Sequence, residues 1–274
     1  MNLNDIQLSF NRALKHTFSK EKLYLVFFIL AACGLLAVFF RGLAVSAGEW
    51  VSLSLFFVPV FLCAGILLST GIILIRIYHD EVKGRPFSYK KIVARSWELI
   101  IGASYFSVPV ILVYLILWMF LGIFMLLKGL PGLGEFMGVI LAFAPFIINF
   151  LTLVLFVLNF AVLFYVTPVV ALKGLSRHMV TQVLMTRWRS DVFSNLLLLL
   201  IAMLPLALLL ILLVASAIIT GQICVNCTDP VLTVIEWFFV MIPFTALLTP
   251  AVIFFFNFAA EAHVLNMREA RSTT

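Results

Sequence analysis

Charged residues are scarce in this 274-residue chain: Lys, Arg, Asp and Glu together make up 11% of it, whereas hydrophobic residues make up 64%. A soluble domain of this length would be about 25% charged, and it could not bury so much apolar surface. Several apolar runs exceed the length of about 18 residues that a helix needs to cross a bilayer. The composition therefore excludes an ordinary soluble protein and predicts an all-α, polytopic transmembrane bundle, one domain over residues 1–274.

Cysteine is also rare, with four residues in the chain. Cys33 and Cys63 lie inside apolar runs and are interpreted as small buried side chains. Cys224 and Cys227 form a C-x-x-C in a loop assigned to the non-cytoplasmic side, where a disulfide is permitted, and both a disulfide and free thiols stay open. A redox-active pair would need a thioredoxin-like βαβ context, which is missing.

Motifs that carry catalysis are missing as well. The sequence contains no nucleophile elbow, metalloprotease motif or Walker motif. His79, Asp80 and Glu81 follow the second apolar run and are interpreted as a solvated helix end rather than a metal site. No ionisable residue lies in the middle of a predicted span, which argues against a proton relay or an ion-coupled transporter. We therefore expect neither enzymatic activity nor a cofactor.

The apolar runs predict six membrane-spanning helices, at about residues 23–40, 51–75, 99–127, 139–170, 196–219 and 237–258. The third run is long enough to tilt or to kink at Pro109, and Pro145 and Pro168 in the fourth run predict bends or helix ends. Asn149 and Asn159 lie in the fourth span, and we expect them to make polar contacts between helices.

Basic residues are distributed unequally between the two sides of these spans. The N-terminal leader (residues 1–22), the linkers at 76–98 and 173–195 and the C-terminal tail hold 16 of the 18 Lys and Arg residues, leaving Arg41 and Lys128 on the other side. Cytoplasmic loops of membrane proteins are enriched in Lys and Arg. The count predicts that both termini are cytoplasmic and that the protein resides in the inner (plasma) membrane. A nucleic-acid partner is not expected, because no segment is long enough to build a folded basic face.

The leader is predicted to be an amphipathic helix with Ile6, Phe10, Ala13, Leu14, Thr17 and Phe18 on its apolar side. Two interpretations are open: the helix lies in the lipid headgroup region, or it packs on cytosolic loops of the same protein. Similar amphipathic patterns occur in both linkers, so the chain could consist of three units, each an amphipathic helix followed by a transmembrane hairpin.

Three short motifs carry a resemblance to known proteins: Phe10-Asn11-Arg12-Ala13, Tyr165-Val166-Thr167-Pro168 and Arg187-Trp188-Arg189. With them, the layout resembles a group of six-span bacterial integral membrane proteins and is similar to the membrane domain of some glycerophosphodiester phosphodiesterases. The soluble phosphodiesterase domain is lacking here, so the resemblance implies a membrane fold and no catalytic residue.

The leading hypothesis is a non-catalytic integral membrane protein that organises lipid or a partner protein through its basic cytoplasmic helices. The expected partners are membrane lipids and a protein on the cytoplasmic side; the sequence leaves the oligomeric state undetermined. The alternative is a transporter or permease subunit for an uncharged or lipidic substrate. The residues expected to contact anionic lipid are Arg12, Lys15, Lys90, Lys91, Arg95, Arg187 and Arg189.

Overall fold

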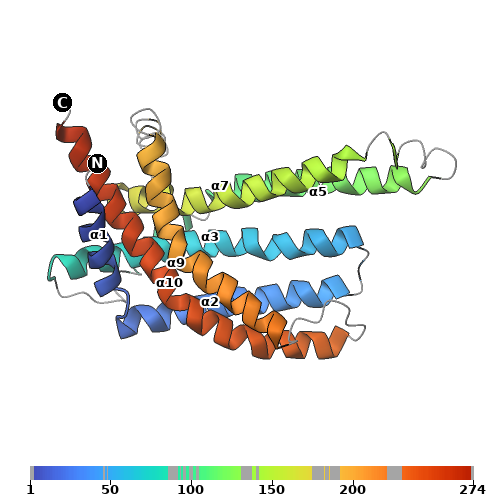
Figure 1. The fold of residues 1–274 in the computed structure, drawn as a ribbon, viewed down its shortest axis with the longest axis horizontal. Helices are drawn as coiled ribbons and strands as arrows, with labels where there is room; N and C mark the ends of the chain where they lie inside the picture. Colours follow the sequence, from blue (N-terminus) through green and yellow to red (C-terminus); the bar gives the residue numbers. More distant parts are fainter. Residues whose placement is uncertain are drawn as a thin grey trace.

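The computed structural model is built of α-helices (Figure 1). It describes residues 3–45, 47, 49–85, 92, 94, 97–98, 101–102, 105–130, 138–139, 142–174, 182, 185, 192–220 and 230–272. Within these residues there is no β-strand. The helices are α1 Leu3–Lys15, α2 Lys20–Val45, α3 Glu49–Val82, α5 Val108–Lys128, α7 Phe143–Lys173, α9 Val192–Ile219 and α10 Pro230–Ser272.

Six of these helices, all except α1, are long and apolar enough to cross a membrane. The prediction of an all-helical, multi-pass membrane protein is confirmed at this level. Both termini lie at the same end of the bundle, which we call the terminal end (Figure 1). The opposite end, where α2 connects to α3, is called the loop end.

The last helix, α10, forms the centre of the structure. It packs against α1, α2, α3, α7 and α9, and every residue from 251 to 263 is buried. A helix that is buried on all sides must be apolar around its whole circumference, and the segment supplies this with Phe254, Phe255, Phe256 and Phe258. α10 also changes direction along its length (Figure 1), and it contains Pro243 and Pro250, which remove backbone hydrogen bonds and permit bends.

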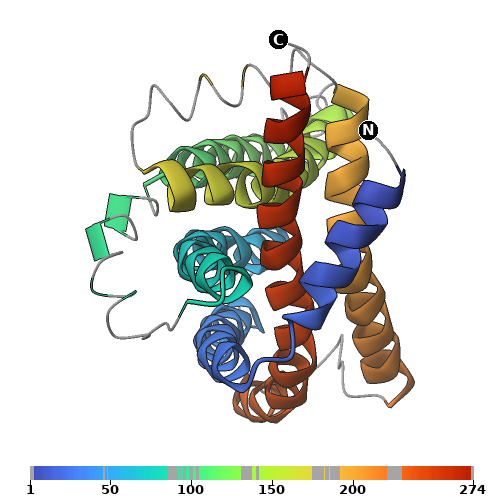
Figure 2. The same ribbon diagram turned by 90° about the vertical axis from the view of Figure 1, so that its left-hand side faces the viewer.

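Two helical segments run across the bundle at the terminal end. Figure 2 looks onto this end, with α2 and α3 seen nearly end-on. α1 lies beside the last part of α10, and both cross the direction of α2 and α3. Helix α3 continues to Val82, so the first seven residues of the predicted 76–98 linker extend the second span.

The prolines of the third and fourth spans act mainly at helix starts. A turn occupies residues 105–107, and α5 begins at Val108 with Pro109 in its first turn. Helix α5 thus begins at Val108, later than the predicted start at residue 99, and Pro109 marks its first turn rather than a kink within it. Proline fits a first turn because the amide hydrogen that it lacks would have no partner within the helix there. Pro145 likewise lies in the first turn of α7, whereas Pro168 lies inside that helix.

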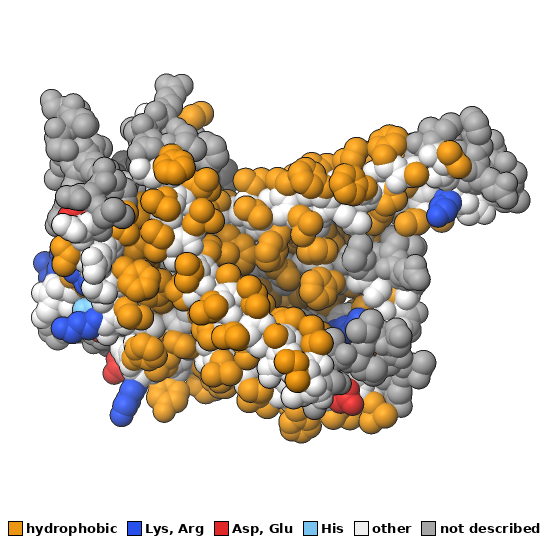
Figure 3. Space-filling model, viewed as in Figure 1, with side chains coloured by type: hydrophobic (Ala, Val, Ile, Leu, Met, Phe, Trp, Pro, Cys, Tyr) orange, Lys and Arg blue, Asp and Glu red, His pale blue; other side chains and the backbone are white. Residues whose placement is uncertain are grey.

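Hydrophobic side chains cover most of the face drawn in Figure 3. In the most apolar stretch of α5 only 11% of the residues are buried, and in α9 only 17%, compared with 56% in α3. A bilayer can solvate such surfaces, because lipid tails are as apolar as the side chains. α5 and α9 thus form the outside of the bundle, and α3 and α10 form its inside.

The predicted three-fold repeat stays a prediction. Only its first amphipathic segment, α1, is described over its length, because most of residues 86–100 and 175–191 lie outside the described residues.

Candidate functional site

A lysine with no exposed surface lies at the terminal end. Lys22 is in the first turn of α2 and its side chain is completely buried. Its ammonium group forms an ion pair with the Glu81 carboxylate of α3 and donates a hydrogen bond to the His16 carbonyl at 3.1 Å. It also lies 5.3 Å from the centre of the Tyr78 ring, within reach of a cation–π interaction. These contacts join α2 to α3 and to the turn that follows α1.

A second carboxylate is held next to this pair. The Tyr78 hydroxyl donates to Glu261 Oε1 at 2.7 Å, and Arg12 Nη1 lies 3.4 Å from Glu261 Oε2. The remaining oxygen of Glu81 lies 3.2 Å from His16 Nδ1. We call Arg12, His16, Lys22, Tyr78, Glu81 and Glu261 the charge cluster.

The carboxylates of the charge cluster are all paired within it. Each of the four carboxylate oxygens has a partner within the cluster. Buried charges are tolerated when they are paired in this way, because the partner compensates for lost hydration. With no carboxylate oxygen left over for a substrate or a metal ion, the arrangement fits a structural clamp. It connects α2, α3 and α10 to α1 and to the turn that follows α1.

Helix α1 is docked on α10 through apolar and polar contacts. The Phe10 ring packs edge-on against Phe254, with 4.9 Å between ring centres, and against Phe258 at 6.3 Å. Asn257 Nδ2 donates to the Ala13 carbonyl at 3.4 Å, and Ala13 is completely buried. The structure shows the leader packed on its own protein, but on helix α10 rather than on the cytosolic loops that the sequence suggested.

Two residues of the predicted apolar side of the leader do not take part. Leu14 is 43% exposed and Phe18 is 66% exposed. The helix ends at Lys15, so Phe18 lies in a turn and no longer follows the helical spacing that the sequence pattern assumed. The buried side of α1 is formed by Ile6, Ser9, Ala13 and, after the helix, Thr17.

Removing the hydroxyl of Tyr78 tests the clamp. The change Tyr78→Phe is expected to lower the free energy of unfolding by about 1.5–3 kcal/mol, the usual contribution of a hydrogen bond to a charged group. Unfolding in detergent, followed by circular dichroism, measures this loss. Tyr24→Phe is the matched control, because Tyr24 on α2 is 66% exposed, and a change there should stay within about 0.5 kcal/mol. Equal stability of the two variants would contradict the clamp.

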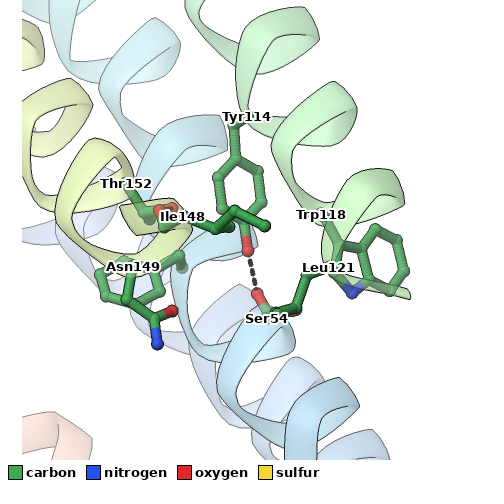
Figure 4. Close-up of a pocket in the computed structure, with 8 residues that line it drawn as sticks. Ser54, Tyr114, Trp118, Leu121, Ile148, Asn149 and Thr152 are labelled. Carbon is green, nitrogen blue, oxygen red and sulfur yellow. Dashed lines mark hydrogen bonds between the residues drawn. The ribbon is translucent and has the colours of Figure 1, made fainter. Parts of the chain in front are cut away.

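A small pocket lies between α3, α5 and α7 (Figure 4). Its lining includes Ser54, Tyr114, Trp118, Asn149 and Thr152, and the Tyr114 hydroxyl donates to the Ser54 carbonyl at 2.5 Å. The cavity volume is about 10 Å³, which is space for about one water molecule. The pocket brings one predicted polar residue, Asn149, to a helix junction, but it is too small for a substrate.

The other predicted site residues are not brought together. Asn159 is buried in α7, 5% exposed, and lies ten positions after Asn149. Lys15 is exposed on α1. Cys63 donates to the Cys33 carbonyl at 3.7 Å, so these thiols lie at the α2–α3 contact. The remaining predicted site residues lie outside the described residues: Lys90, Lys91, Arg95, Arg187, Arg189, Cys224 and Cys227. In the part of the chain that the structure describes, no group of three His, Cys, Asp or Glu could hold a metal ion.

Sequence reasoning missed the charge cluster. It treated Lys22 as the end of the leader and Glu81 as part of a solvated helix end, which is wrong because Glu81 binds Lys22 and only 21% of its side chain is exposed. A usable signal was present. Lys22 begins the first span, Glu81 follows the second and Glu261 follows the sixth, so the charge count places all three at the same side of the membrane.

Compared with protein-family models, with curated proteins and with solved structures, the chain shows no match. The resemblance to the membrane domain of some glycerophosphodiester phosphodiesterases therefore stays a prediction from three short motifs. Two of these motifs contribute to packing: Phe10 contacts α10, and the Tyr165 hydroxyl donates to the Asn195 carbonyl of α9 at 2.7 Å.

Proposed function

We propose that this chain is a non-catalytic integral membrane protein that organises anionic lipid or a partner protein through basic helices at its terminal end. The observation that carries the proposal is the docking of α1. Its apolar side is occupied by α10, Lys15 is presented on its exposed side, and the half-exposed Arg12 is held by its pair with Glu261. A helix held in this way displays its basic residues at a fixed height on the bundle.

The proposal places the terminal end in the cytoplasm and the protein in the plasma membrane. It rests on the 16 basic residues assigned to that side and on the positive-inside rule. The cytoplasmic leaflet carries anionic lipids, and each Lys or Arg near its surface gains about 1 kcal/mol. The charge cluster adds support, because its carboxylates are neutralised internally and do not repel an anionic surface.

Transport receives less support from the geometry. A substrate path would require a cavity that reaches the middle of the membrane, whereas the pocket between α3, α5 and α7 holds about one water molecule.

The test removes basic residues from the predicted lipid-contact set by changing four of them to glutamine: Lys15, Lys90, Lys91 and Arg95. The variant is expected to lose enrichment of phosphatidylglycerol over phosphatidylcholine, by about 1 kcal/mol for each charge that lies near the surface. Native mass spectrometry of the protein released from nanodiscs of mixed lipid measures the enrichment. The effect should shrink as salt is added, because salt screens exposed charges.

Lys128→Gln is the control. Lys128 is an exposed basic residue at the last position of α5, and the charge count assigns it to the side opposite the four changed residues. In a second experiment, the wild-type protein and the four-residue variant are cross-linked to neighbouring proteins in native membranes. If lipid enrichment is unchanged and a cross-linked protein disappears only in the four-residue variant, the partner is a protein. If neither readout changes, the proposed function is wrong.

A further inference from the structure

An arginine without an ionic partner lies near the loop end. Arg41 is four residues before the end of α2 and is one of the two basic residues assigned to that side. The ion pairs found among the described residues involve Arg12, His16 and Lys22, not Arg41. The Arg41 Nε atom is buried and has no hydrogen-bond partner. Among the described residues neither terminal nitrogen has a hydrogen-bond partner, and neither is among the buried atoms without one, so the donor end of the half-buried guanidinium reaches the surface.

Trp237 of α10 adds a second unsatisfied donor. The Arg41 guanidinium carbon lies 5.4 Å from the centre of the Trp237 ring, a cation–π distance. The indole Nε1 is also buried without a partner. Buried donors are nearly always paired in proteins, and both Arg and Trp only donate. Because Arg41 Nε and Trp237 Nε1 are buried, an acceptor from outside can reach only the terminal nitrogens of Arg41, and the charge of Arg41 selects an anion.

Close packing of α2 on α10 fixes the position of these two side chains. A side chain at Gly42 would lie 2.7 Å from Val234 Cγ2, so only glycine permits this approach. Val234 and Trp237 are three positions apart and share one face of α10. Arg41, next to Gly42 on α2, is held over the ring by this contact.

The depth of the pair matches a lipid headgroup. Four residues of helix correspond to about 6 Å, so Arg41 lies about 6 Å inside the end of α2. Trp is enriched at membrane interfaces, and Arg near a helix end extends its charged group toward the headgroups. Exposed apolar side chains flank the pair on both helices: Phe39, Leu43, Ile235, Phe238 and Phe239. These could contact acyl chains, which free phosphate does not have.

We propose that Arg41 and Trp237 bind the phosphate group of a phospholipid in the leaflet at the loop end. Arginine binds phosphate oxygens through two parallel hydrogen bonds, and the terminal nitrogens of Arg41 are placed to form them. The ring of Trp237 orients the guanidinium. This site shares no residue with the charge cluster or with the lipid contacts proposed for the terminal end. It would add a contact to the opposite leaflet of the membrane.

Native mass spectrometry of the detergent-purified protein, titrated with phosphatidylglycerol, tests the site. The wild-type protein should retain one phospholipid that Arg41→Gln binds about tenfold more weakly, which corresponds to about 1.4 kcal/mol. Arg41→Lys keeps the charge but cannot form two parallel hydrogen bonds, so its affinity for the phospholipid should lie between those of the wild type and Arg41→Gln. Lys128→Gln, the other basic residue assigned to that side, should bind as the wild type does.

Two further arms identify the source of the phosphate and control for folding. Inorganic phosphate should not displace the retained lipid; if phosphate alone occupies the site, the assignment to lipid is overturned. The melting temperature without added lipid should be similar for Arg41→Gln and Arg41→Lys, which separates binding from stability. Retention of the same lipid with the same affinity by wild type and Arg41→Gln would overturn the proposal.

Discussion

Replacing Lys22 with alanine is expected to lower the free energy of unfolding by about 3 kcal/mol, because it leaves the largely shielded Glu81 carboxylate without its lysine partner. Lys22 has no exposed side-chain surface, and 79% of the Glu81 side chain is shielded, given its exposure of 21%. The loss would also remove the hydrogen bond to the His16 carbonyl. Thermal unfolding in detergent measures the effect, and limited trypsin digestion at Arg12 and Lys15 reports whether α1 detaches.

Two comparisons make this prediction specific. Lys20→Ala, at an exposed position in the same turn of α2, should change stability by no more than about 0.5 kcal/mol. The double change Lys22→Met with Glu81→Leu should recover much of the loss, because an apolar pair of similar volume can replace a buried ion pair. A Lys22→Ala variant as stable as Lys20→Ala would mean that the ion pair contributes nothing to the clamp.

The second large effect is expected at Gly71, where α3, α7 and α10 meet. A methyl group there would collide with the Phe256 ring and would lie 2.7 Å from Thr167 Cγ2. The change Gly71→Ala should therefore destabilise the protein by about 1–3 kcal/mol, as overpacking of a core does. The measurement is again the free energy of unfolding in detergent.

Gly65 provides the matched control on the same helix. A methyl group at Gly65 would be 3.4 Å from Ser107, an ordinary contact. Alanine is favoured over glycine inside a helix by about 1 kcal/mol, so Gly65→Ala should leave stability unchanged or raise it. If both variants behaved alike, close packing at Gly71 would not be needed for the fold.

The helical spans were predictable because a bilayer imposes a simple physical requirement. About 20 apolar residues must be continuous to cross it, and the chain satisfies this in six places. The residues at which helices begin and end were less predictable. Pro109 fits either a kink or a first turn, and only the packing of the preceding residues 105–107 as a turn decides between them.

The charge cluster shows why the site was harder to predict. A lysine beside an apolar run normally extends into the headgroup region, and nothing near Lys22 in sequence indicates burial. Its partner Glu81 is 59 positions away. The same holds for α1, since its amphipathic pattern would serve a lipid surface or α10 equally well. Long-range pairing, which a single sequence does not reveal, decides both cases.

The central position of α10 has a consequence for biosynthesis. Chains emerge N-terminal end first, so α1, α2, α3, α7 and α9 are all made before the helix that they pack on. Until α10 is inserted, the close-packed side of α2 at Gly42 has no neighbour, and Tyr78 and Arg12 lack the carboxylate of Glu261. Insertion of α10 thus completes assembly, and chains interrupted before it would display unpaired polar groups to the proteases of membrane quality control.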